Sequence, residues 1–221
     1  MSTARADILD SIRRSLGRGG LDPATEAGLR QRLSAHRRQI GLARTDKDHA
    51  ELVDLFEEMA KALSATVSHI PNSAGVPEAV ATYLAEQNLP AQAVVAPALQ
   101  SVPWADRPTL ELRFGKAVNE DLVSITPVIG AVAETGTLVL TSGPESPTTL
   151  NFLPDTHIAV VNRSQITGRY EDVWDKIRDN GTLPRTVNMI SGPSRTGDIE
   201  QTIQLGAHGP RRLHILILDE A

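Results

Sequence analysis

The chain has 221 residues, 40% of them hydrophobic and 22% charged, and a formal net charge of −5. This length suits one domain with an appended segment, and the acidic balance argues against nucleic acid and anionic membranes as partners. The absence of cysteine excludes disulfides, thiolate zinc sites, a cysteine nucleophile and cysteine-ligated iron–sulfur clusters. No apolar run is long enough to span a bilayer, and the N-terminus lacks the apolar core of a signal peptide. We expect a cytoplasmic globular protein.

Residues 1–47 are predicted to form an N-terminal helical arm. Ile8, Leu9, Ile12 and Leu16 lie on one stripe of a helix, and a helix this short needs a partner surface to be stable. The remainder, rich in Gly, Arg and Gln, favours helix fragments and loops. The arm is expected to pack on its own domain or on another subunit, so a homo-oligomer stays open.

Residues 48–221 are predicted to form one α/β domain. After the first helix, which is marked by Leu52 to Leu63, helices are expected over 77–88, 170–180 and 197–205. Strands are expected over 65–70, 92–96, 110–114, 122–128, 137–142, 157–162, 186–190 and 213–218. Because the strands are short and apolar on both sides, the pattern predicts a three-layer α/β/α fold with a mostly parallel sheet.

The first candidate site is the turn Ala133–Thr137. A carboxylate at a glycine-bearing turn among apolar neighbours could act as base, acid or nucleophile, so Glu134 is a catalytic candidate. Thr135, Gly136 and Thr137 are ligand-binding candidates, because Gly136 would let the backbone approach a ligand closely. The competing interpretation is that Glu134 satisfies backbone donors in a tight turn.

The second candidate site is the segment Ser191–Glu200, interpreted as a passage from a strand into a helix. Such a passage is expected at the carboxyl edge of the sheet, where free N–H groups of a helix start attract anions. Ser194, Arg195 and Thr196 add donors, and Arg195 could grip a carboxylate or phosphate. Asp198 is also a ligand-binding candidate, but it could instead cap the helix and fill its positive end.

Two histidines complete the set of candidates. His157 starts a predicted strand and is a ligand-binding candidate, and His208 lies in the loop Gly206–Pro210 and is a catalytic candidate. Either could carry a proton near neutral pH, or be structural. No pair of potential ligands has diagnostic metal spacing, so no metal site is predicted.

Four blocks of sequence together resemble the LUD-domain family: Ala133–Leu140, Leu153–His157, Ser191–Glu200 and Gly206–Pro210. The resemblance implies an α/β/α fold of the NagB/RpiA/CoA-transferase-like type. It also implies a part in the oxidation of L-lactate to pyruvate, together with iron–sulfur partner proteins. No cofactor is predicted within this chain, since the clusters are expected only in those partners.

Three functions remain open at this stage. The leading hypothesis is a component of L-lactate utilization that binds a small carboxylate or a partner protein at the carboxyl edge of the sheet. One alternative is a stand-alone enzyme of the CoA-transferase or sugar-phosphate isomerase type that uses Glu134. The other is a ligand-sensing module without turnover. Whether the chain is itself an enzyme is left undecided.

Overall fold

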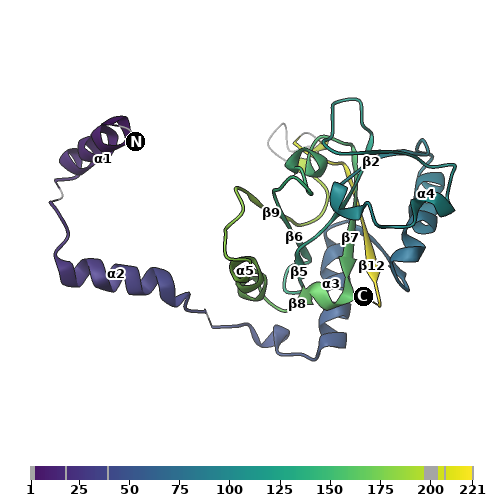
Figure 1. Ribbon diagram of the computed structural model, residues 1–221. Coiled ribbons are helices and arrows are strands. Elements are labelled where there is room, and N and C mark those ends of the chain that lie inside the picture. Colours follow the sequence, from purple (N-terminus) through teal and green to yellow (C-terminus); the bar gives the residue numbers. More distant parts are fainter. Residues whose placement is uncertain (1–2, 18, 39, 197–203, 207, 221) are drawn as a thin grey trace. The chain divides into compact units, whose positions relative to one another are not determined.

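A computed structural model of the chain describes residues 3–17, 19–38, 40–196, 204–206 and 208–220. The chain forms two units, residues 1–40 and 41–221. The first unit holds helices α1 (Thr3–Ser15) and α2 (Pro23–Ala35), drawn in purple in Figure 1. Helix α2 begins at Asp22, whose carboxylate accepts a 2.9 Å hydrogen bond from the amide of Thr25. Neither helix has a buried side chain in the part that the structure describes.

The second unit is built on a sheet of six parallel strands. Their order is β1-β12-β7-β4-β2-β3. The strands are β1 (Thr66–Ile70), β2 (Gln92–Val95), β3 (Glu111–Phe114), β4 (Val123–Pro127), β7 (Thr156–Asn162) and β12 (Arg212–Leu218). The predicted α/β fold with a parallel sheet is therefore confirmed.

A second sheet of four strands accompanies the first and was not predicted. Its order is β8-β5-β6-β9, with β6 antiparallel to both of its neighbours. The strands are β5 (Gly130–Val132), β6 (Thr137–Thr141), β8 (Ile166–Thr167) and β9 (Val187–Ile190). The expected strands over 137–142 and 186–190 thus exist but belong to this sheet. Both faces of β6 are buried, which makes its sequence resemble a strand of a covered parallel sheet.

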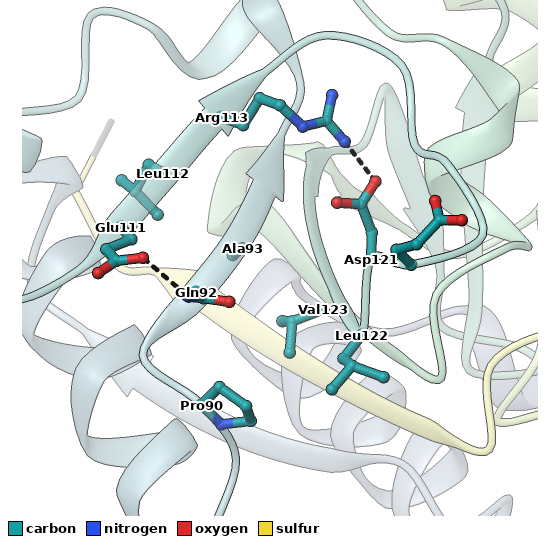
Figure 2. Close-up of a pocket in the computed structure, with 10 residues that line it drawn as sticks. Pro90, Gln92, Ala93, Glu111, Leu112, Arg113, Asp121, Leu122 and Val123 are labelled. Atoms are coloured by element: carbon teal, nitrogen blue, oxygen red, sulfur yellow. Dashed lines mark hydrogen bonds and ion pairs between the residues drawn. The ribbon is translucent and has the colours of Figure 1, made fainter.

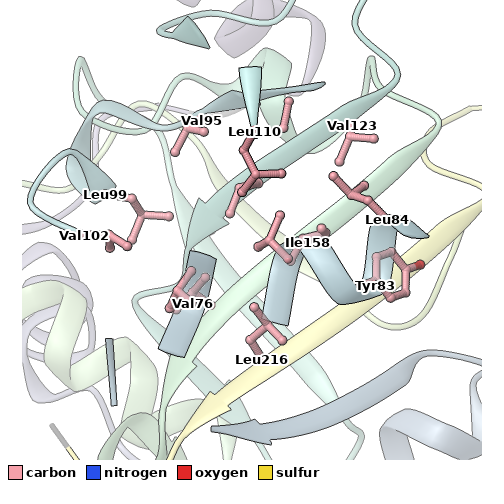
Figure 3. Close-up of a cluster of buried hydrophobic side chains, with 14 of the residues drawn as sticks. Val76, Tyr83, Leu84, Val95, Leu99, Val102, Leu110, Val123, Ile158 and Leu216 are labelled. Carbon is pink, nitrogen blue, oxygen red and sulfur yellow. The ribbon is translucent and has the colours of Figure 1, made fainter. Parts of the chain in front are cut away.

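The α-helices that lie against the sheets in the described part of the second unit are α3 (His49–Ala62), α4 (Val76–Glu86) and α5 (Tyr170–Asp179). Helix α4 covers one face of the parallel sheet, where Val76, Val80 and Leu84 pack on Ile158 and Leu216 (Figure 3). Helix α3 and the inner face of the second sheet cover the other, and α5 packs on the outer face of the second sheet. Burial of these apolar faces stabilises the layers, at about 25 cal/mol per Å².

Short elements fill the connections. The 3₁₀ helices span Ala43–Thr45, Ser73–Gly75, Pro97–Leu99, Trp104–Asp106, Thr148–Asn151 and Arg163–Gln165. Strands β10 (Arg195–Thr196) and β11 (Gln204–Leu205) pair antiparallel. The helix expected over 197–205 is thus wrong at its end, because Gln204 and Leu205 are extended and paired; residues 197–203 lie outside the described residues. Among the described helices, none is long and apolar enough to cross a membrane.

Candidate functional site

The segment Ser191–Arg195 lies at the amino edge of the parallel sheet, and the predicted carboxyl-edge position is wrong. The amide of Ser194 donates to the carbonyl of Pro210 at 2.8 Å, just before β12 begins. Arg195 donates to the carbonyl of Leu63 at 3.3 Å, between α3 and the start of β1. The prediction failed because β9, which leads into this segment, belongs to the second sheet, where the carboxyl-edge rule for parallel strands does not apply.

A pocket of about 390 Å³ opens at this segment and is called the Ser191 pocket below. It is lined by Leu63, Phe152, residues 189–195 and residues 208–210. The polar side chains there are those of Ser191, Ser194, Arg195 and His208. No aspartate or glutamate stands among its described lining residues, and Arg195 supplies a permanent positive charge. The lining therefore favours an anion over a cation.

Gly192 fixes this segment against the end of α3. Its φ is +78°, in the left-handed region, and a Cβ at this position would lie 2.5 Å from the carbonyl oxygen of Leu63. Any other residue would therefore be strained and would also clash. The glycine of the Ser-Gly-Pro-Ser motif thus serves a close approach of two backbones.

The guanidinium of Arg195 is anchored at the pocket wall. Its Nη2 donates to the Leu63 carbonyl and contacts the hydroxyl of Ser64. These contacts hold one end of the planar group, and Nε and Nη1 make no hydrogen bond to another residue of the described chain. A guanidinium carries five N–H donors and a permanent charge, so Nε–H and the two N–H groups of Nη1 can each donate to an anion.

Ser194 joins the two C-terminal motifs. Its hydroxyl accepts a long 3.4 Å hydrogen bond from the amide of His208, and its carbonyl accepts from the amide of Gly206 at 3.0 Å. The structure therefore brings Ser194, Arg195 and His208 together, although they lie on two separate blocks of sequence.

Four hydroxyl groups connect the Ala133–Thr137 turn to the pocket. The hydroxyl of Thr137 lies 2.7 Å from that of Thr135, 2.9 Å from that of Tyr170 and 2.7 Å from that of Ser191. The hydroxyls of Thr135 and Tyr170 are 2.8 Å apart. Thr135 and Thr137 thus reach the pocket through Ser191. We call these four groups the hydroxyl cluster.

The carboxylate of Glu134 does not line the Ser191 pocket. It lies 3.8 Å from the guanidinium of Arg44, and its side chain is 20% exposed. A Cβ on Gly136, whose φ is +62°, would lie 2.5 Å from the backbone nitrogen of Ala60 in α3. The glycine of this turn therefore allows close packing on a helix.

His157 is fully buried on β7. Its Nε2 lies 2.7 Å from the hydroxyl of Thr126, and burial lowers the pKa of its imidazole to about 4. The ring is neutral near pH 7, which fits the structural alternative. Thr196 lies in β10 with its backbone paired to Gln204, and Asp198 lies outside the described residues.

The comparisons with known proteins place these motifs in a family. A family model described as the LUD domain matches residues 53–218. The chain belongs to the LUD-domain family. The match covers the parallel sheet and the second sheet, and it leaves out the unit formed by residues 1–40.

Relatives of this LUD domain differ in how much of their length is aligned. An uncharacterized protein of Neisseria meningitidis is 43% identical over 89 residues, 39% of this chain and 38% of that protein. The lactate utilization protein C of Deinococcus radiodurans is 30% identical over 181 residues, 76% of this chain and 80% of that protein. The protein of that name from Geobacillus kaustophilus is 27% identical, over 85% of this chain and 78% of its own length.

A solved structure shares the fold of this LUD domain. It is the crystal structure of a DUF162 family protein from Deinococcus radiodurans, with a TM-score of 0.62 and 24% sequence identity. The alignment covers 78% of this chain and 99% of that one.

Two features of the LUD domain were missed from the sequence. The first is Tyr170, which was treated only as the start of a helix, since no local signal connects it to Thr135.

The second missed feature is a pocket of about 440 Å³ at the other end of the amino edge, between β2, β3 and β4. Figure 2 shows Arg113 paired with Asp121 there, and Gln92 donating to Glu111. With Glu120, its carboxylates outnumber its single arginine, so this pocket is unsuited to an anion.

Proposed function

We propose that this LUD-domain protein is a cytoplasmic component of lactate utilization and that its Ser191 pocket binds a small carboxylate. The name shared by several relatives, lactate utilization protein C, supports the first part. The observation that carries the second is the lining of the pocket, where an anchored arginine stands beside two serines and a histidine with no described acidic side chain.

The pocket divides into parts suited to the two ends of such a ligand. The N–H groups on Nε and Nη1 of Arg195 are the donors left for the carboxylate, which binds through a charge-assisted hydrogen bond. Leu63, Phe152 and Pro193 supply apolar surface for a short carbon chain. The volume of about 390 Å³ lies toward the small end of the range for ligand pockets, roughly 300–1,000 Å³.

Electron transfer is assigned to partner proteins in this proposal. The chain has no cysteine, so it has no thiolate with which to hold an iron–sulfur cluster. Partners that carry such clusters would accept the electrons released when L-lactate becomes pyruvate, and this chain would bind substrate or product beside them. Co-purification of those partners with the tagged protein from cells grown on lactate is the expected result.

The binding proposal is tested by titrating the full chain with L-lactate in a calorimeter. Arg195→Met keeps an unbranched apolar side chain and removes the guanidinium, and it should weaken binding by about tenfold or more, since a hydrogen-bonded charge contributes ~1.5–3 kcal/mol. The matched control is Arg185→Met, because Arg185 is exposed and does not line the pocket. Equal binding by the wild type and Arg195→Met would contradict the assignment.

A further inference from the structure

The hydroxyl cluster has a fixed number of protons to share. Each of its four hydroxyls carries one proton and two acceptor lone pairs. Thr135, Thr137 and Tyr170 form a closed triangle of three contacts, at 2.7, 2.8 and 2.9 Å. Three hydrogen bonds among three hydroxyls use all three of their protons, so Thr137 has none left for a fourth bond.

The fourth contact therefore takes its proton from Ser191. The Ser191 and Thr137 oxygens are 2.7 Å apart, and with Thr137's proton committed to the triangle, Ser191 is the donor. Thr137 is fully buried, so its hydroxyl makes its hydrogen bonds to protein groups and not to solvent. Ser191 is exposed and lines the pocket. What Ser191 offers the pocket is then a pair of acceptor sites.

We propose that Ser191 is a specificity residue that selects a 2-hydroxy acid over the matching 2-oxo acid. The inference rests on the proposed function, in which Arg195 binds the carboxylate. The hydroxyl of a 2-hydroxy acid can donate to Ser191, whereas the carbonyl of a 2-oxo acid has only lone pairs and meets another acceptor. The pocket would then hold L-lactate more tightly than pyruvate.

Thr137→Val tests whether the hydroxyl of Ser191 donates to that of Thr137. The substitution is nearly isosteric and removes the hydroxyl that accepts from Ser191, so the Ser191 proton can turn into the pocket and donate to a carbonyl. Titrations of the full chain with L-lactate and with pyruvate should show a preference for lactate of about tenfold in the wild type, corresponding to one hydrogen bond. In Thr137→Val this preference should disappear.

Two further variants separate this effect from a loss of structure. Thr141→Val makes the same change on the same strand, at a threonine whose hydroxyl bonds to no other described residue, and it should keep the wild-type preference. Ser191→Ala changes an exposed residue, so it should disturb the fold less than a substitution at the buried Thr137. It should weaken lactate binding by about tenfold and leave pyruvate binding little changed.

The outcomes distinguish the inference from the function on which it rests. Equal binding of the two acids by the wild type, or an unchanged preference in both Ser191→Ala and Thr137→Val, would overturn the role of Ser191 and leave the carboxylate pocket standing. Failure of both acids to bind the wild type at millimolar concentration would overturn the pocket itself, and the inference with it.

Discussion

The hydroxyl oxygen of Ser191 lies 2.7 Å from that of Thr137. Thr137 starts β6 directly after the Glu-Thr-Gly turn, and Ser191 follows the last residue of β9. Because β6 and β9 pair antiparallel, with Leu138 opposite Ile190, the start of one strand lies beside the end of the other. Two motifs 54 residues apart are thus joined at the rim of one pocket.

Thr137→Val should also lower the stability of the fold. The variant removes one buried partner and leaves the hydroxyls of Thr135, Tyr170 and Ser191 with fewer hydrogen bonds, at a cost of ~1–3 kcal/mol. Urea unfolding followed by circular dichroism measures the change, and Thr141→Val should stay within ~0.5 kcal/mol of the wild type. If the two variants unfold at the same urea concentration, the hydroxyl cluster contributes nothing to stability.

Gly192→Ala should destabilise the protein and weaken ligand binding together. The new Cβ meets the carbonyl of Leu63 at a positive φ, and both the strain and the clash cost free energy, ~1–3 kcal/mol in total. Gly143→Ala is the control, since a Cβ at Gly143 meets no described atom within 4 Å. Thermal unfolding of the two variants makes the comparison, and a Gly192→Ala protein as stable as Gly143→Ala would contradict the close approach.

His69 should make stability fall as the pH rises above neutral. Its ring nitrogens each lie 3.1 Å from a carboxylate, those of Glu57 and Asp219, which in turn pair with Lys61 and Arg163. Partial burial lowers the pKa of His69, but the two carboxylates outweigh it, and the pKa is raised above its usual 6.5.

The sign follows from this raised pKa. The folded state binds the proton more tightly than the unfolded state, so the stabilisation is complete below the unfolded pKa and is lost as the pH rises through the folded pKa. The free energy of unfolding of the wild type should therefore fall more between about pH 6 and about pH 8 than that of His69→Gln. Equal slopes in the wild type and His69→Gln would rule out the effect.

His157 and His214 should have the opposite effect in acid. Burial lowers the pKa of each to about 4, so the unfolded state binds protons that the folded state does not. Stability is complete above pH ~6.5 and is lost as the pH falls toward the folded pKa, by up to ~3 kcal/mol for each residue. The free energy of unfolding, measured in urea, should fall less steeply with falling pH in His157→Asn than in the wild type. An equally steep fall in the two proteins would contradict the prediction.

The sequence pattern predicted the parallel sheet well because its central strands, β4, β7 and β12, are buried at nearly every position. Strand β7, for instance, has four consecutive apolar residues, Ile158 to Val161, all of them buried, and such runs need both faces of a sheet to be covered. The same pattern could not assign β6 and β9 to a separate sheet, because α5 covers the outer face that a lone second sheet would leave in water. Strand partners are a property of the tertiary fold and leave no local mark.

The sequence singled out several residues that the structure brings together, but it did not predict how they are arranged. Ser194, Arg195 and His208 do line one pocket, but the edge of the sheet was predicted wrongly, since it depends on which sheet β9 joins. Gly136 and Gly192 were visible as glycines, while their close contacts with α3 arise only from packing. The hydroxyls of Tyr170 and Thr135 are hydrogen-bonded although the two residues are 35 positions apart in the sequence, and no local motif could have predicted that contact.

The central claim is that the Ser191 pocket binds a small carboxylate, and nuclear magnetic resonance tests it most directly. Titration of the ¹⁵N-labelled chain with L-lactate should shift the amide signals of Ser191, Ser194, Arg195 and His208 in a saturable way. The signals of Glu111 and Asp121, in the pocket with more carboxylates, should stay in place. Shifts confined to Glu111 and Asp121, or no saturable shift at the Ser191 pocket, would contradict the account.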